Sequence, residues 1–221
     1  MTQTRFSLEE RIVSCEACPR LRDFLEECRE KHPTYWGRPV HGFGDPEASL
    51  YILGLAPGYH GANRWGRVFT GDDSGRWLYG ALHELGLASA PRSEHREDGL
   101  QLSGVWIGNA VRCVPPGNRP LGTELDQCRP YLTEELAALR NVRAVLCLGH
   151  LSHQTYLKHR GHRPSEFPFS HTAVHELPGA PHRLIASYHP SRQNTNTGRL
   201  TRDMWIHAIR TAAEQAGLQS P

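Results

Sequence analysis

Four cysteines in the chain have the spacing of a metal-binding set. Cys15 and Cys18 form a Cys-x2-Cys pair, and Cys113 and Cys128 follow about a hundred residues later. Four thiolates brought together by folding suit a zinc ion or an iron–sulfur cluster. Proline follows Cys18 directly and follows Cys113 after one valine, and proline fixes a turn beside a ligand. The sequence therefore predicts a metal centre built from two distant segments.

The other two cysteines have ordinary surroundings. Cys147 lies in the apolar run 144–148, where we expect a buried small hydrophobic residue. Cys28 lies in the charged stretch 26–31, where we expect a surface or half-buried thiol. Disulfides are the rival explanation for all of these thiols. Because the chain shows no apolar leader and no run of membrane-spanning length, we expect a cytoplasmic protein, and a reducing cytoplasm favours a metal over disulfides.

The composition is that of one globular domain. A chain of 221 residues has room for one full core, and we expect a single domain over residues 1–221 that acts as a monomer. The net charge of +2 neither indicates nor excludes a nucleic-acid partner, because a basic face can lie within a balanced total. There is no internal repeat, and only residues 88–98 have the composition of a linker.

Apolar periodicity predicts strands that alternate with helices. Strands are expected at residues 49–55, 105–111, 143–148 and 183–187, with a minor strand at 173–177. Helices are expected at 7–30 (interrupted near residue 18), from a Ser74 cap to 86, from a Thr123 cap to 139 with a kink at Pro130, at 150–159 and at 200–216. Such alternation indicates an α/β fold with a mostly parallel sheet, whose carboxyl edge is where ligands bind.

Three segments carry unusual residues, and the first and the last of them follow predicted strands. They read Gly54-Leu55-Ala56-Pro57-Gly58, Asn63-Arg64 through Phe69-Thr70-Gly71-Asp72, and His189-Pro190-Ser191-Arg192-Gln193-Asn194. Together they resemble the motifs of the uracil-DNA glycosylases, and most closely family 5, the iron–sulfur branch of broad specificity. The resemblance runs from about Cys15 to Trp205. It implies a three-layer α/β/α sandwich around a central four-stranded, mainly parallel sheet.

The resemblance also implies an activity, a cofactor and a partner. The enzyme would hydrolyse the N-glycosidic bond of uracil, and also of hypoxanthine and xanthine, in DNA and leave an abasic site. A [4Fe-4S] cluster would be held by Cys15, Cys18, Cys113 and Cys128, tying the N-terminal helical segment to the rest of the domain. The partner is DNA that contains deaminated bases, and the substrate nucleotide must leave the base stack.

The family pattern assigns the chemistry to two residues. Because Leu55 stands where other families have a polar or acidic residue, the carboxylate must come from elsewhere. Asp72 matches the aspartate of this branch, whereas Asp73 falls where alanine is usual. Both also precede a helix, where carboxylates act as caps. We predict that Asp72 stabilises the cationic sugar and that His189 donates a hydrogen bond to the departing base.

Base and DNA contacts follow from the same resemblance. Base contacts are expected at the glycine-rich loop, one aromatic residue and two asparagines: Gly54, Ala56, Pro57, Gly58, Phe69, Asn109 and Asn118. Minor-groove and phosphate contacts are expected at Ser191, Arg192, Gln193 and Asn194. An amide at Asn109 would read the uracil edge and narrow specificity, because the uracil-restricted family 4 has asparagine at this position.

Three alternatives remain at this level. One is a non-catalytic iron–sulfur module for DNA binding or electron transfer, and another is a family 4 glycosylase. The third is a zinc-dependent base deaminase, which requires His-x-Glu and Pro-Cys-x-x-Cys signatures that the chain lacks. The histidine pairs 150/153, 159/162 and 171/175 have no supporting carboxylates, and we expect them to be solvated.

Overall fold

A mixed sheet forms the centre of the computed structural model, which describes residues 2–219. Within that range the sheet has six strands in the order β1-β3-β2-β4-β6-β5. Its four inner strands are parallel: β2 (Leu50–Gly54), β3 (Val105–Asn109), β4 (Ala144–Leu148) and β6 (Arg183–Ser187). Short antiparallel strands lie at the two edges: β1 (Phe43–Gly44) and β5 (Val174–Glu176).

The expected α/β architecture is confirmed, but the count of four strands is wrong. The runs at 49–55, 105–111, 143–148 and 183–187 do form the parallel inner strands, and the minor strand at 173–177 forms β5. β1 was not predicted from the sequence, because two residues cannot show an alternating pattern of apolar and polar side chains. Its pairing with β3 depends on where the chain returns in three dimensions.

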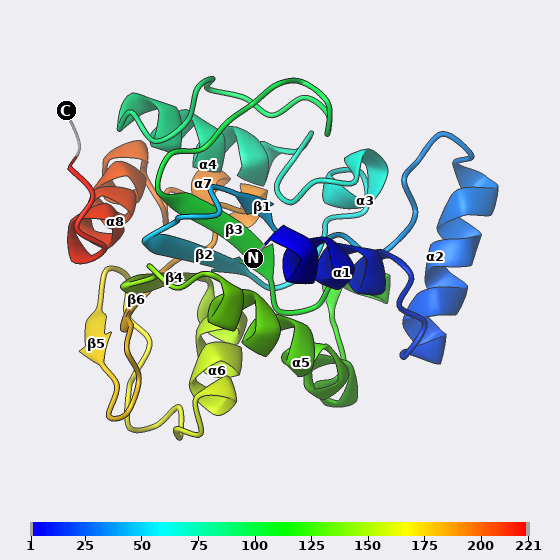
Figure 1. Cartoon of the computed structure of the whole chain (residues 1–221). Helices are drawn as coiled ribbons and strands as arrows, with labels where there is room; N and C mark the ends of the chain where they lie inside the picture. The colour runs from blue at the N-terminus through cyan, green and yellow to red at the C-terminus, as the bar shows by residue number, and fades with distance from the viewer. Residues whose placement is uncertain (1, 220–221) are drawn as a thin grey trace.

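Helices cover both faces of the sheet (Figure 1). α4 (Asp73–Glu84) and α8 (Arg202–Gln215) pack on one face, and α5 (Gly122–Ala138) and α6 (His150–His159) on the other. Strand β2 shows why both faces need cover. Leu50 and Ile52 belong to the core beneath α4 and α8, whereas Tyr51 and Leu53 belong to the core beneath α5 and α6. Alternate residues of a strand face opposite ways, so the sheet needs a layer on each side.

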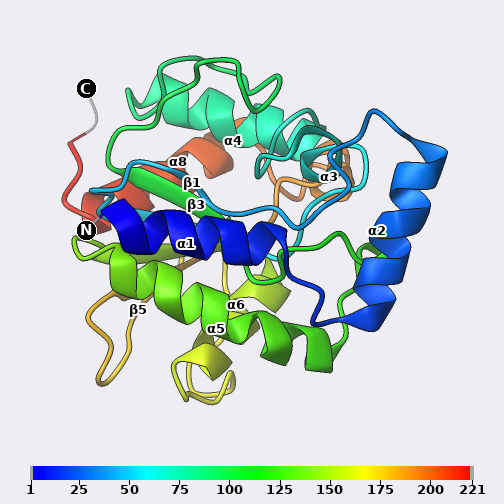
Figure 2. The same ribbon diagram turned by 45° about the vertical axis from the view of Figure 1, so that its right-hand side comes forward.

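The N-terminal region forms two helices, with the expected break between them. α1 (Thr2–Val13) lies along α5 (Figure 2), and α2 (Pro19–Lys31) stands at the side of the molecule. Three short helical segments complete the chain: α3 (Ala62–Trp65), η1 (Pro116–Asn118) and α7 (Arg192–Asn196). None of the helices within residues 2–219 combines the length and apolarity needed to cross a bilayer.

Two expected helix starts are wrong. Asp72, and not Ser74, caps α4, because its Oδ1 accepts a hydrogen bond of 2.8 Å from the Gly75 amide. α5 begins at Gly122, one residue before the expected cap at Thr123, and it continues through Pro130. Glu124 fixes this start by accepting a 2.7 Å hydrogen bond from the Leu121 amide. A proline in a helix loses one backbone hydrogen bond, and tertiary packing offsets that loss here.

Candidate active site

A cavity of about 750 Å³ opens at the carboxyl edge of the parallel strands. The loops after β2 and β4, the end of β3, the loop after β6 and the start of α4 all contribute to its wall. Ten residues predicted from the sequence line it: Ala56, Pro57, Gly58, Phe69, Asp72, Asn109, Asn118, His189, Ser191 and Arg192. The three remaining predicted residues, Gly54, Gln193 and Asn194, are not in its lining.

Gly54 lies behind the cavity wall, and its lack of a side chain leaves room for the Asn109 and Phe69 side chains that form the wall. A Cβ atom at this position would come within 2.3 Å of Oδ1 of Asn109 and 2.8 Å of the Phe69 ring. Any larger residue would therefore displace both side chains from the cavity. Glycine at the end of β2 allows an aromatic ring and an amide to meet against the backbone.

One carboxylate oxygen of Asp72 accepts a hydrogen bond from helix α4, and the other lies toward the cavity. Its Oδ1 caps α4, while its Oδ2 faces the glycine-rich loop, 3.0 Å from where a Cβ of Gly58 would stand and 2.2 Å from one of Gly61. Burial raises the pKa of Asp72 above its ordinary value, although the Gly75 amide opposes the shift. The capping role and the position at the cavity are therefore compatible, since they use different oxygens.

Asp73 has a different environment. Its carboxylate forms an ion pair with Arg76 in the first turn of α4, and its Oδ2 lies 3.4 Å from Nε of Arg192. Both partners are exposed arginines, and the Arg192 side chain is 80% accessible. The two neighbouring aspartates thus have different partners. Asp72 accepts a hydrogen bond from a backbone amide, whereas Asp73 pairs with two guanidinium groups.

His189 forms the opposite part of the wall. Its ring lies 6.1 Å from the Phe69 ring, at an interplanar angle of 31°. Burial lowers the pKa of His189 to about 4, so the imidazole is neutral at neutral pH. Nδ2 of Asn194 donates a 2.8 Å hydrogen bond to the His189 carbonyl. The side chain of Asn194 therefore supports the histidine loop from outside the cavity.

Asn109 brings an unsatisfied polar group to the cavity. The residue is 1% exposed, and within the described part of the chain its Oδ1 has no hydrogen-bond partner. A buried acceptor without a donor costs free energy, on the order of 1–3 kcal/mol. Such a group is stabilised when a ligand brings an N–H to it, so the arrangement favours a ligand with a donor at this point.

Comparison with known proteins decides the family. The model of the uracil DNA glycosylase superfamily matches residues 41–213. The chain belongs to this superfamily. It is 49% identical to a type-5 uracil-DNA glycosylase of Thermus thermophilus, over 94% of this chain and 96% of that protein. It is 44% identical to the type-5 uracil-DNA glycosylase of Pyrobaculum aerophilum, over 94% and 91%.

The same comparisons separate two branches of the superfamily. The type-4 uracil-DNA glycosylase of Pyrobaculum aerophilum is 27% identical over 83% of this chain and 81% of that protein. The chain is therefore much closer to the type-5 protein of that organism than to its type-4 protein. The resemblance to family 5 is confirmed, and the overall identities disfavour the type-4 alternative.

The part of the cavity wall that follows β4 was not predicted from the sequence. Leu148, Gly149, His150, Leu151 and Ser152 all line the cavity. Their position at the end of a parallel strand was a usable signal, and the strand itself was predicted correctly. The expectation of solvated histidines is wrong for His153, which is 1% exposed on α6. Burial lowers the pKa of His153 to about 4, so its ring packs in neutral form.

The four predicted cysteine ligands gather between α2, α5 and the loop after β3. Cys113 and Cys128 are buried, and Cys15 and Cys18 are half-buried. Burial raises the pKa of Cys18 to about 11, with further increases from Cys128 and Cys15. The pKa of Cys113 is raised by burial and by the other three thiols of the set. The effects of Cys128 on Cys18 and of Cys15 and Cys18 on Cys113 show that folding brings the two halves of the set together.

The other two thiols, Cys28 and Cys147, show no electrostatic interaction with the four cysteines of this set. All six cysteines of the chain are free, so the disulfide explanation is wrong. Cys147 is fully buried in β4, as expected, whereas Cys28 is fully buried on α2 rather than on the surface. Within residues 2–219 no three His, Cys, Asp or Glu side chains are arranged to hold a single metal ion.

Proposed function

We propose that this chain is a DNA repair glycosylase that hydrolyses the N-glycosidic bond of uracil in DNA and leaves an abasic site. The observation that supports the proposal most is the wall of the cavity, where an ionisable carboxylate, a neutral imidazole, an aromatic ring and a buried amide face one space: Asp72, His189, Phe69 and Asn109. The superfamily match supports the same class of enzyme. We expect one domain over residues 1–221, acting as a monomer on DNA in the cytoplasm.

The proposed reaction begins with a nucleotide that has left the stack. Its base stacks on Phe69, and Oδ1 of Asn109 accepts from the base N–H. As the C1′–N bond breaks, its electron pair moves onto the base, and His189 donates a hydrogen bond to the base oxygen that gains charge. Asp72 stabilises the cationic sugar and orients water. The hydroxyl of that water bonds to C1′, and its proton ends on the released base.

The state of each ionisable group suits its role. Burial lowers the pKa of His189 to about 4, so the ring is neutral at neutral pH, and a neutral imidazole still carries one N–H that can be donated to the base. Burial raises the pKa of Asp72, and the hydrogen bond from the Gly75 amide opposes this shift because it stabilises the carboxylate form. A fixed negative charge beside the sugar is what an oxocarbenium-like transition state requires.

The loop after β6 would hold the DNA. Ser191, Arg192 and Gln193 begin α7 beside the cavity, and the guanidinium of Arg192 is exposed. Positive charge and polar side chains at this position suit phosphates and the minor groove. Asn194 contributes through its hydrogen bond to the His189 carbonyl, which couples the DNA-facing loop to the imidazole.

The substrate range extends to other deaminated bases on this proposal. Uracil, hypoxanthine and xanthine all present a ring N–H beside a carbonyl, whereas adenine and cytosine present a bare ring nitrogen there. An acceptor at Asn109 therefore distinguishes deaminated bases from these two parents by the direction of one hydrogen bond. On this proposal Asn109 admits all three deaminated bases, in contrast to the sequence-based expectation that it narrows the range to uracil. The cavity of about 750 Å³ leaves room for a purine.

The cysteine set fits a [4Fe-4S] cluster by its donor chemistry. Such clusters take four thiolates, one for each iron. Cys113 and Cys128 are buried, Cys15 and Cys18 are half-buried, and Cys113 interacts with the other three thiols. A bound cluster would supply a cross-link between the N-terminal helices and the loop after β3. The thiols would ionise on binding, because metal coordination offsets the cost that burial imposes on a thiolate.

The test is excision from oligonucleotides that contain uracil, hypoxanthine, xanthine or only normal bases, followed by alkaline cleavage at abasic sites. We expect cleavage of the uracil strand in a G·U pair, slower cleavage of the two purines and none of the normal strand. No cleavage of any strand by protein with a full complement of iron would sink the proposal and leave the iron–sulfur redox module as the alternative. Cleavage of uracil alone would restrict the substrate range to the type-4 pattern.

A further inference from the structure

Phe69 has a backbone conformation that an aromatic residue rarely adopts. Its φ is 54°, in the left-handed region, and its side chain is 8% exposed at the cavity wall. A bulky L-residue clashes with its own carbonyl there, so the conformation persists only where neighbouring groups over-determine it. The stacking surface of the cavity therefore depends on whatever holds the backbone on either side of Phe69.

The residues on both sides are held by hydrogen bonds. The Val68 carbonyl accepts a 2.8 Å hydrogen bond from the Tyr79 hydroxyl. After Phe69, the Thr70 and Ser93 hydroxyls lie 2.7 Å apart, and the Gly71 amide donates to the Ser93 carbonyl at 3.3 Å. Ser93 thus contacts the strained segment through both its side chain and its backbone.

Arg67 and Asp98 add further hydrogen bonds to Ser93 and to the chain before Phe69. Nη1 of Arg67 donates to Oδ1 of Asp98 at 2.6 Å and to the Ser93 hydroxyl at 3.0 Å. The arginine side chain is 6% exposed and lies over the Phe43 ring of β1 at 4.3 Å. A buried, hydrogen-bonded ion pair has one favoured geometry, which makes it a firm anchor for the chain on each side.

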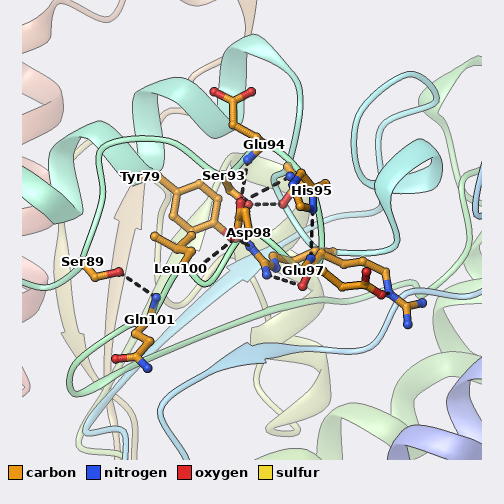
Figure 3. A network of polar contacts seen from close by, with 12 residues as sticks. Tyr79, Ser89, Ser93, Glu94, His95, Glu97, Asp98, Leu100 and Gln101 are labelled. Carbon is orange, nitrogen blue, oxygen red and sulfur yellow. Dashed lines mark hydrogen bonds and ion pairs between the residues drawn. The ribbon is translucent and has the colours of Figure 1, made fainter.

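The loop that carries Ser93 and Asp98 is itself tightly folded, although its composition resembles a linker. Figure 3 shows Asp98 at the centre of its polar contacts. Oδ2 of Asp98 accepts from the Glu94 amide at 2.7 Å, and its Oδ1 accepts from the Leu100 amide at 3.0 Å. At the base of the loop the Ser89 hydroxyl accepts from the Gln101 amide at 2.9 Å. The loop is therefore a rigid part that approaches Phe69 from outside the cavity.

We propose that Ser93 and Asp98 are positioning residues for base recognition, acting through Arg67 and Thr70 to keep Phe69 in its left-handed conformation. Neither residue lines the cavity, so neither would touch the base. The inference rests on the proposed function, because it treats Phe69 as the surface on which the extruded base stacks. It assigns the loop 89–102 a part in excision that its sequence does not suggest.

The first test compares two serines of the same loop under single-turnover conditions. Ser93→Ala removes the hydroxyl that contacts Thr70 and Arg67, and it should slow uracil excision about 10- to 100-fold, the cost of a misplaced group. Ser89→Ala removes a hydroxyl that only holds the base of the loop, and it should leave the rate near that of wild type. Equal rates for both variants and wild type would overturn the inference.

A second pair covers the case in which Ser93→Ala does not fold. Thr70→Val removes the partner hydroxyl with little change of shape and should slow excision as Ser93→Ala does. Thr70→Ser keeps the hydroxyl and should restore most of the rate. If Thr70→Val folds and excises as fast as wild type, the hydroxyl contact does not position Phe69.

A double-mutant cycle separates positioning from general loss of stability. In a Phe69→Ala background there is no ring to position, so adding Ser93→Ala should change the excision rate by less than about twofold. A further drop as large as that in the wild-type background would show that Ser93 acts elsewhere, and the inference would fail.

A readout without catalysis keeps this inference distinct from the proposed function. In protein labelled with 4-fluorophenylalanine, the Phe69 resonance, assigned by its loss in Phe69→Leu, should shift or broaden in Ser93→Ala but not in Ser89→Ala. If that holds while wild type excises no base, the positioning stands and the proposed function fails. If wild type excises uracil but the resonance is the same in all three proteins, the positioning fails and the proposed function stands.

Discussion

The cavity and the cysteine corner, which is the set Cys15, Cys18, Cys113 and Cys128, share one loop but differ in their surroundings. The segment from β3 to η1 carries Asn109 and Asn118, which line the cavity, and between them Cys113, which faces the other thiols. At the cavity, Oδ1 of Asn109 has no hydrogen-bond partner in the described part of the chain, and the pKa values of Asp72 and His189 are shifted. The pKa values of Cys18 and Cys113 are also shifted, chiefly by burial, and the cysteine set packs with apolar side chains from α2 and the strand end: Leu21, Leu25, Val111 and Val114.

The difference supports the proposal that the reaction takes place at the cavity. Groups whose charge or hydrogen bonding is unsettled in the free protein are ready to be stabilised by a substrate, and they cluster at functional sites. Thiols enclosed by apolar residues are instead suited to a closed structural centre. On this comparison, changes at the cavity should alter rates, and changes at the corner should alter stability.

The largest effect on the rate is expected for His189→Ala. Loss of one preorganised donor to developing charge typically costs about 2.7–4 kcal/mol, or 10²–10³-fold. Single-turnover excision of uracil should fall by that factor, with binding to uncleaved DNA nearly unchanged. His83→Ala, at an exposed position in the last turn of α4, is the matched control. Near-normal excision by His189→Ala from single-stranded DNA would remove this histidine from the chemistry.

The next effect separates the two aspartates. Asp72→Asn keeps an oxygen to cap α4 but removes the charge, so excision should slow about 100-fold with little loss of helix stability. Asp73→Asn removes only the partner of Arg76 and Arg192, and the rate should stay within a few fold of wild type because exposed ion pairs contribute about 0–1 kcal/mol. A large loss for Asp73→Asn beside a small one for Asp72→Asn would identify Asp73 as the functional carboxylate.

A smaller effect is expected from acid. Only ionised Asp72 stabilises the sugar cation, and burial raises the pKa of this group, so excision should decline as pH falls toward a midpoint above the ordinary aspartate value of 3.8. Below the midpoint the rate should fall about tenfold per pH unit. The residual activity of Asp72→Asn should lack this decline. A decline that persists in the variant would assign the titration to another group.

The smallest effect on the rate is expected at the cysteine corner. Cys113→Ser should lose the visible absorption of an iron–sulfur centre and lower the Tm, because a metal centre that forms only in the folded chain stabilises it. The folded fraction at low temperature should still excise uracil at a rate of the wild-type order. Cys147→Ala, at a buried thiol outside the set, should keep the absorption. Complete loss of excision by folded Cys113→Ser would break the comparison, since the corner would then serve the reaction directly.

The local pattern predicted most of the fold. Apolar runs located all four parallel strands, because a strand buried on both faces must be apolar throughout. Helix starts and edge strands were less predictable. The cap of α4 was predicted at Ser74 but lies at Asp72, because neighbouring polar residues compete for the same backbone amides. β1 was not predicted because its two residues are too few to show an alternating pattern.

The site was predicted in part, for a related reason. Loops that follow parallel strands must meet at one edge, so the places of Asp72, Asn109 and His189 around one cavity could be expected. The amide of Asn194 could not be placed in this way, because its partner is a backbone carbonyl that every residue carries. The burial of His153 was also hidden, since a histidine in a polar stretch has no pattern of its own.

The residue types supply the groups that the proposed chemistry uses, which are four thiols, a carboxylate and an imidazole, and the apolar runs locate the parallel strands. Folding sets the partners of these groups. It gave Asp72 two differently engaged oxygens, and it held Phe69 in a left-handed backbone through Ser93 and Arg67. The reason is physical: residue type sets what a group can do, whereas its partners, burial and backbone strain depend on segments that meet only when the chain has folded.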